Sequence, residues 1–61
     1  MQIEIGQTFV ERDNAKFSWR VDRLLSDGIH AVVINTDQPT RQKTIAIWAL
    51  LNTKLYVSKG P

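Results

Sequence analysis

Apolar and polar residues alternate over residues 17–22 of this chain. Phe17, Trp19 and Val21 are apolar, and the residues between and after them are polar. A period of two residues is typical of a β-strand with one buried face. The pattern therefore predicts a strand whose inward side carries these three residues, and it places Trp19 in the core and not on a ligand-binding surface.

An Asp27-Gly28 pair follows this strand and lies between two apolar runs. Aspartate and glycine favour the positive φ angles that both central residues of a type I′ turn require. The pair therefore predicts a tight hairpin turn. The β-branched run at residues 30–34 is short and is expected to form the returning strand.

The same stretch also has a helical interpretation. Between Asp13 as N-cap and Gly28 after the C-cap, four apolar residues would share one helix face: Phe17, Val21, Leu24 and Leu25. In such a helix Trp19 would project from the polar side, and the strand at residues 30–34 would lose its sequential neighbour. We therefore prefer the strand interpretation.

Two registers are open for this hairpin. A two-residue turn pairs Leu25 with His30 and Val21 with Ile34, which puts His30 on the same face as Trp19. A three-residue turn at residues 26–28 pairs Val21 with Val33 and moves His30 to the opposite face. Because a slip of one residue exchanges the faces, an observed His30 opposite Trp19 would exclude the first register. We prefer that first register, which predicts this inward cluster: Phe17, Trp19, Val21, Leu25, Val32 and Ile34.

The rest of the chain predicts three further strands and a helical turn. Strand-forming residues occupy positions 8–10, 43–48 and 55–57, with a turn at Asp13-Asn14 and a polar loop at residues 36–42 that contains Pro39. Residues 49–52 have poor strand character and suit one helical turn. The predicted fold class is therefore all-β, with five strands and a short helical turn before the last strand.

This order of elements resembles the SH3-like small β-barrel over residues 6–58. The resemblance is one of architecture, because the ALYDY-type segment and paired tryptophans of peptide-binding SH3 domains are missing, as is the glycine-rich signature of KOW domains. Membership of such a barrel implies a binding module for a peptide or a nucleic acid.

Composition describes one small folded domain over residues 1–61. Apolar residues make up 43% and charged residues 23% of the chain, and no apolar run approaches the ~20 residues that a membrane span needs. There is no cysteine, which excludes a disulfide and agrees with a cytoplasmic location. A domain of this size buries only about 60% of its unfolded surface, so a homodimer is one expected way to gain stability.

Charge and chemistry favour binding over catalysis. The net charge is only +2, and the four charged residues after Asp37 are all cations: Arg41, Lys43, Lys54 and Lys59. His30 is the only histidine, and with Ser26 and Asp27 it lies on one turn that is too tight for a catalytic triad. Neither a phosphate-binding glycine loop nor a metal-ligand spacing occurs. We therefore expect no enzyme activity, no cofactor and no metal.

Exposed aromatic residues near cations carry the functional hypothesis. Trp48 either lies on the outer face or rim, if Ile45 and Ile47 point inward, or folds over the barrel end as core. An exposed tryptophan beside cations would anchor a protein partner or stack on bases. The candidate binding residues are Asp37, Arg41, Lys43, Trp48 and Tyr56, with the 36–44 loop. The first hypothesis is a non-catalytic module that binds a protein; a weak nucleic-acid-binding module and a self-associating structural subunit are the alternatives.

Overall fold

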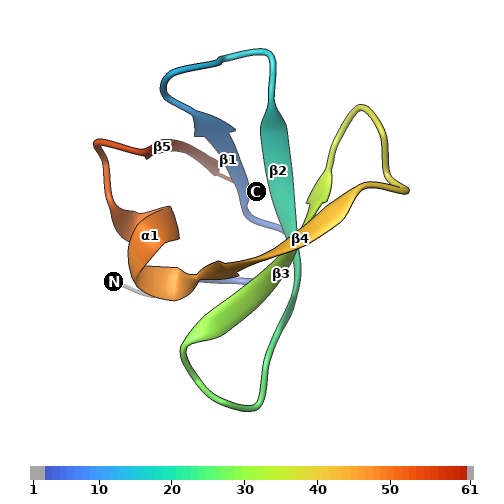
Figure 1. Cartoon of the computed structure of the whole chain (residues 1–61), viewed down its shortest axis with the longest axis vertical. Helices are drawn as coiled ribbons and strands as arrows, with labels where there is room; N and C mark the ends of the chain where they lie inside the picture. Colours follow the sequence, from blue (N-terminus) through green and yellow to red (C-terminus); the bar gives the residue numbers. More distant parts are fainter. Residues whose placement is uncertain (1–2, 61) are drawn as a thin grey trace.

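A computed structural model describes residues 3–60 and shows an all-β chain with one short helix (Figure 1). The strands join in the order β4-β3-β2-β1-β5, every neighbouring pair is antiparallel, and the sheet curls into a half-barrel. The elements are β1 (Thr8–Glu11), β2 (Ser18–Leu24), β3 (His30–Asn35), β4 (Gln42–Ala46), α1 (Ile47–Leu51) and β5 (Tyr56–Gly60). The predicted fold class is confirmed, including a helical segment before the last strand, and the helical interpretation of residues 14–27 is excluded.

The helix begins earlier than the sequence indicates. The predicted strand at residues 43–48 ends at Ala46, whose extended backbone is the N-cap of α1. The apolar pair Leu50-Leu51 explains this boundary, because a helix that starts at Ile47 points Leu50 into the core, where its side chain is only 1% exposed. Trp48 consequently belongs to α1 and not to β4.

The pairing of β2 with β3 combines the two registers that the sequence leaves open. Near the turn, the Leu25 N–H donates to the His30 carbonyl oxygen at 3.0 Å, as in the preferred register. Farther from the turn, Val21 pairs with Val33, as in the alternative register. The register shifts between Val21 and Arg23, so Asp22 is the extra residue of a β-bulge. The predicted pairing of Val21 with Ile34 is therefore wrong, although the pairing at the turn is right.

The bulge decides which face His30 occupies. Trp19 pairs with Asn35, and β3 pairs with β4 without interruption, so the odd-numbered residues of β3 share the face of Trp19 and the even-numbered residues lie opposite. His30 therefore lies on the face opposite Trp19, against our expectation. Ala31 and Val33 take the inward positions of β3 and are fully buried.

The predicted inward cluster is correct in part. Trp19 and Val21 are buried in the core, as predicted. Val32 is buried, but β3 alternation places it on the opposite face. Phe17 is 38% exposed in the loop before β2, and Leu25 and Ile34 are only half-buried.

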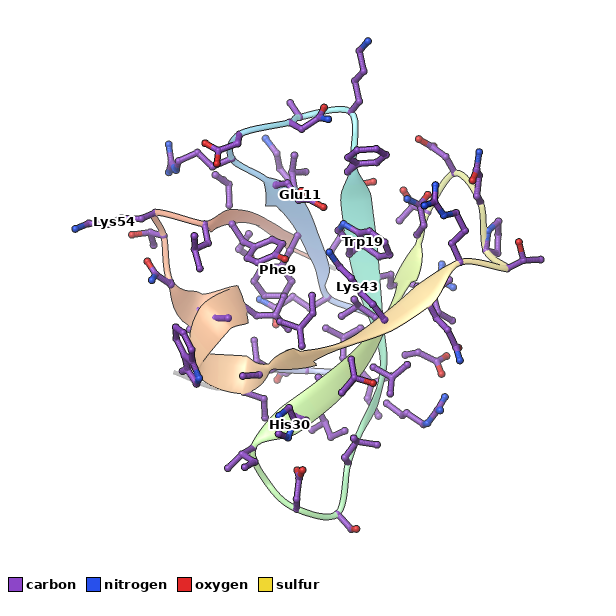
Figure 2. The ribbon with its side chains drawn as sticks, in the orientation of Figure 1. Phe9, Glu11, Trp19, His30, Lys43 and Lys54 are labelled. Carbon is purple, nitrogen blue, oxygen red and sulfur yellow. The ribbon has the colours of Figure 1, made fainter. Side chains whose placement is uncertain are left out.

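The core fills the concave side of the half-barrel. Phe9 lies between the sheet and α1 (Figure 2) and is paired across the β1–β2 ladder with Trp19. The half-buried side chains of Ile45 and Tyr56 pack against this core from the two edge strands β4 and β5. Its buried members are Ile3, Phe9, Trp19, Val21, Ala31, Val33 and Leu50.

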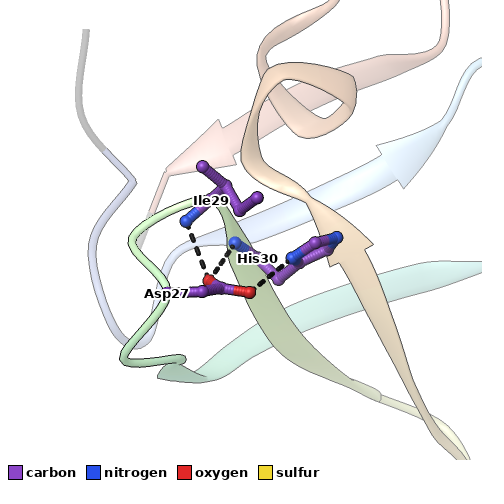
Figure 3. Close-up of polar contacts among 3 residues, drawn as sticks. All are labelled: Asp27, Ile29 and His30. Carbon is purple, nitrogen blue, oxygen red and sulfur yellow. Dashed lines mark hydrogen bonds and ion pairs between the residues drawn. The ribbon is translucent and has the colours of Figure 1, made fainter.

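Asp27 organises the turn between β2 and β3 (Figure 3). Its Oδ1 accepts the N–H groups of Ile29 at 2.9 Å and His30 at 3.0 Å, and its Oδ2 lies 2.7 Å from His30 Nδ1. Gly28 has a φ of 76°, but no other residue type has a positive φ among residues 3–60. The predicted type I′ turn is therefore wrong, because Asp27 uses its side chain to cap the turn and keeps a negative φ.

These hydrogen bonds make a pH-dependent contribution to stability. The Ile29 N–H, then the His30 side chain, lower the pKa of Asp27 below its ordinary value. A lowered folded-state pKa means stability that is present above about pH 4 and is lost as the pH falls through the folded-state value. At pH 6 we expect the wild type to have a higher melting temperature than Asp27→Asn. This difference should vanish near pH ~2. Thermal unfolding followed by circular dichroism measures both melting temperatures. An equal difference at both pH values would contradict the assignment.

Candidate binding surfaces

The predicted binding residues do not form one site in a single chain. Arg41 ends the loop before β4, whereas Trp48 lies on α1 after β4. In Figure 1 the loop and the helix lie at opposite ends of this strand. Lys43 and Tyr56 are brought together elsewhere, on the concave side. The predicted set is thus divided among three places.

Trp48 is a large exposed apolar side chain on a fixed element. It is 69% exposed, which decides between the two positions that the sequence allows. Two residues along a helix turn the side chain by about 200°, so the burial of Leu50 directs Trp48 outward. Ile29 lies in the neighbouring segment, because the Ile47 N–H donates to its carbonyl oxygen at 2.8 Å, and it is 59% exposed. The hairpin tip and the start of α1, joined by this hydrogen bond, therefore each carry an exposed apolar residue.

Lys43 points to the concave side and packs on aromatic rings. Its Nζ lies 4.2 Å from the centre of the Trp19 ring and 6.0 Å from that of Tyr56. The same Nζ is 3.5 Å from Glu11 Oε2, and Figure 2 shows Glu11, Trp19 and Lys43 converging from three strands. We call these four residues the lysine cluster. The ammonium group of Lys43 therefore has partners within the same chain, namely Glu11 and the Trp19 ring.

Glu11 completes the lysine cluster and was not predicted. Its Oε2 accepts the Nε1–H of Trp19 at 2.8 Å, so one carboxylate is the partner of both a buried indole and an ammonium group. The signal was present in the sequence, because Glu11 follows Phe9 by two residues and so shares its inward face. A shallow hollow of about 200 Å³ opens beside the cluster and is lined by Glu11, Asp13, Ala49, Leu55 and Tyr56.

Asp37 and Arg41 lie together in an ordered loop. The buried Asn35 accepts the N–H groups of Asp37 and Gln38, both at 2.9 Å, and the Arg41 N–H donates to the Gln38 carbonyl oxygen at 2.9 Å. Ser18 and Thr36 bond through their hydroxyl groups at the base of the loop. The loop borders a second hollow of about 210 Å³, whose lining is Lys16, Phe17, Asn35, Asp37, Gln38 and Arg41.

Over residues 3–60 the structure shows exposed side chains and shallow hollows but no assembled metal site. No group of three or more metal-ligating side chains gathers there. No helix in that part of the chain is long and apolar enough to cross a membrane. Comparisons with protein-family models, with curated proteins and with solved structures gave no match. The candidate surfaces are therefore judged on their geometry.

Proposed function

We propose that this protein is a non-catalytic, SH3-like binding module that contacts a protein partner through the surface around Trp48. The observation that carries the proposal is the 69% exposure of this side chain. Tryptophan is among the residues that contribute most to the free energy of protein association. Because Leu50 anchors α1 in the core, the backbone at Trp48 is fixed before binding, and less backbone entropy is lost on association.

The SH3-like assignment is supported by the order of the elements. The last strand, β5, pairs with the first, β1, and a short helix precedes it. The curled half-barrel that results is compatible with a small barrel of this type. A chain without cysteine is compatible with a reducing compartment, and we propose a cytoplasmic location.

The arrangement of cations favours a protein over a nucleic acid as the partner. Binding to a single strand combines base stacking on aromatic rings with cations along the backbone path. Lys43 is held by Glu11 and Trp19, and Arg41 lies at the other end of β4 from Trp48. The exposed tryptophan therefore has neither of these predicted cations beside it in one chain.

The proposal predicts that Trp48→Ala abolishes partner binding without unfolding the protein. We expect a loss in affinity of about 30-fold or more, because a central tryptophan contributes about 2 kcal/mol or more. A partner is first recovered by affinity capture with the wild type, and its dissociation constant is then measured by calorimetry for each variant. The melting temperature of Trp48→Ala should stay close to that of the wild type, because the side chain is exposed.

Phe17→Ala is the matched control for this experiment. Phe17 is also a partly exposed aromatic residue, but it borders the hollow beside Asp37 and Arg41. We expect this variant to bind the partner as the wild type does. Wild-type affinity in Trp48→Ala, with loss of affinity in Phe17→Ala, would move the binding surface to the 36–41 loop.

A further inference from the structure

Strand β4 is one edge of the sheet, and its outer side carries unpaired backbone groups. Hydrogen bonds to β3 are seen at both ends, from the Asn35 N–H to the Arg41 carbonyl oxygen and from the Ile47 N–H to the Ile29 carbonyl oxygen. The ladder between them has no register shift. Antiparallel pairing alternates, so odd-numbered residues of β4 bond β3 and even-numbered residues direct their N–H and C=O groups away from it. No strand of residues 3–60 pairs with this free side.

We infer that β4 pairs with β4 of a second copy of this chain, antiparallel about a two-fold axis at Thr44. In this register the N–H and C=O of Thr44 bond the same groups of the second Thr44. The Ala46 N–H reaches the Gln42 carbonyl oxygen of the other copy. Such an interface is isologous, because the same strand is used on both sides and the assembly closes at two copies.

The side chains of β4 are complementary to themselves in this register. Gln42 lies opposite Ala46 of the other copy, and Lys43 lies opposite Ile45, so no like charges face each other across the new ladder. Exposed charges on an edge strand normally oppose such pairing. Here Lys43 is the only charged residue of β4, and its ammonium is directed to Glu11 and Trp19 on the concave side. The free edge itself is therefore uncharged.

The same two-fold axis unites binding residues that one chain keeps apart. In an antiparallel pair, the start of one β4 lies beside the end of the other. Arg41, which precedes β4, is then brought next to α1 of the second copy, where Trp48 is exposed. A guanidinium group over an indole ring is a favourable cation–π arrangement. The inference thus rests on the proposed role of Trp48 as a binding surface, and it names the partner as a second copy of the chain.

Proline at Thr44 tests the pairing without breaking the fold. Because the Thr44 N–H faces away from β3, Thr44→Pro removes a donor that only the second copy would use. Thr44→Ala keeps this donor and is the matched control. In light scattering over a concentration series, we expect twice the monomer mass for the wild type and Thr44→Ala. We expect Thr44→Pro to need a concentration about 100-fold higher to dimerise. Circular dichroism of Thr44→Pro confirms that it is folded.

Cysteine cross-linking fixes the register and gives a second measurement. The chain contains no cysteine, so each variant carries one thiol. Across the proposed axis the Cα atoms of the two Thr44 residues are about 5.5 Å apart, which suits a disulfide. We expect Thr44→Cys to form a disulfide-linked dimer under mild oxidation. Lys59→Cys, on the opposite edge strand β5, should form no disulfide link, although it still pairs through β4.

The outcomes separate this inference from the proposed function. A wild type that stays monomeric at all concentrations overturns the β4 pairing, while Trp48-dependent binding of a different protein would leave the proposed function intact. Cross-linking between Thr44→Cys and Lys59→Cys in a mixture also overturns it, because β4 would then pair with β5 in a head-to-tail assembly. A Thr44-dependent dimer that is unchanged by Trp48→Ala supports the strand pairing but removes the role of Trp48.

Discussion

Phe9→Ala is expected to leave a large fraction of the protein unfolded at 25 °C. Phe9 is 2% exposed and lies at the centre of the core, opposite Trp19 in the β1–β2 ladder. Replacing a buried phenylalanine with alanine costs about 3–5 kcal/mol, because apolar burial is lost and a cavity remains. A single core of this size supplies only about 3–5 kcal/mol of stability. The two quantities are comparable, so one substitution removes nearly all of the free energy of folding.

Phe17→Ala provides the matched control for this prediction. The same side chain is removed, but Phe17 is 38% exposed and lies outside the core cluster. We expect a loss of about 1 kcal/mol or less for this variant. Urea unfolding followed by circular dichroism measures both. If the two variants unfold at the same urea concentration, Phe9 does not hold the central position that the structure gives it.

Glu11→Ala is expected to destabilise the protein by about 2 kcal/mol, far more than an exposed carboxylate would. Removal of this carboxylate leaves the indole N–H of the buried Trp19 without its acceptor and the ammonium of Lys43 without its counter-charge. Urea unfolding gives the free energy. The indole N–H resonance of Trp19 should also shift in the proton NMR spectrum, because it loses a hydrogen bond.

Glu11→Gln separates the hydrogen bond from the charge. Glutamine keeps an oxygen that can accept the Trp19 N–H but removes the ion pair with Lys43, which is partly open to solvent. Such pairs contribute about 0–1 kcal/mol, so this variant should lose no more than that. Equal losses in Glu11→Ala and Glu11→Gln would show that the ion pair, and not the hydrogen bond to Trp19, stabilises this side of the half-barrel.

Local patterns were sufficient to predict most of the fold. The alternation at residues 17–22 located β2, and Asp27-Gly28 located the hairpin, because both signals lie within a few residues. The bulge at Asp22 was not predictable in this way. No glycine or proline marks it, and it arises because the turn fixes one register while the pairing of Trp19 with Phe9 and Asn35 fixes another.

The binding residues show the same division between local and long-range information. The alternation of apolar and polar residues correctly predicted that Trp19 lies in the core, and the sequence left open that Trp48 faces outward. It could not place the start of α1, which depends on how Leu50 reaches the core. The environment of Lys43 was also missed. Its inward direction follows from the register of β3 with β4, and its partner, Glu11, comes from a strand that is 32 residues away in sequence.

The β-bulge at Asp22 has a consequence for how this chain tolerates change. The bulge shifts the register of β2 against β3 by one residue. The hairpin tip and the part of β2 beside the core therefore pair with β3 in two different registers. Asp27 and Gly28 set the register at the tip, and Trp19 and Val21 set the register beside the core. A change of one residue in the length of the tip can therefore be taken up at the bulge. Deletion of Asp22 would make Val21–Val33 and Arg23–Val32 consecutive pairs of a regular ladder, so both halves would keep their pairing and β2 would lose only the local bend that the bulge introduces.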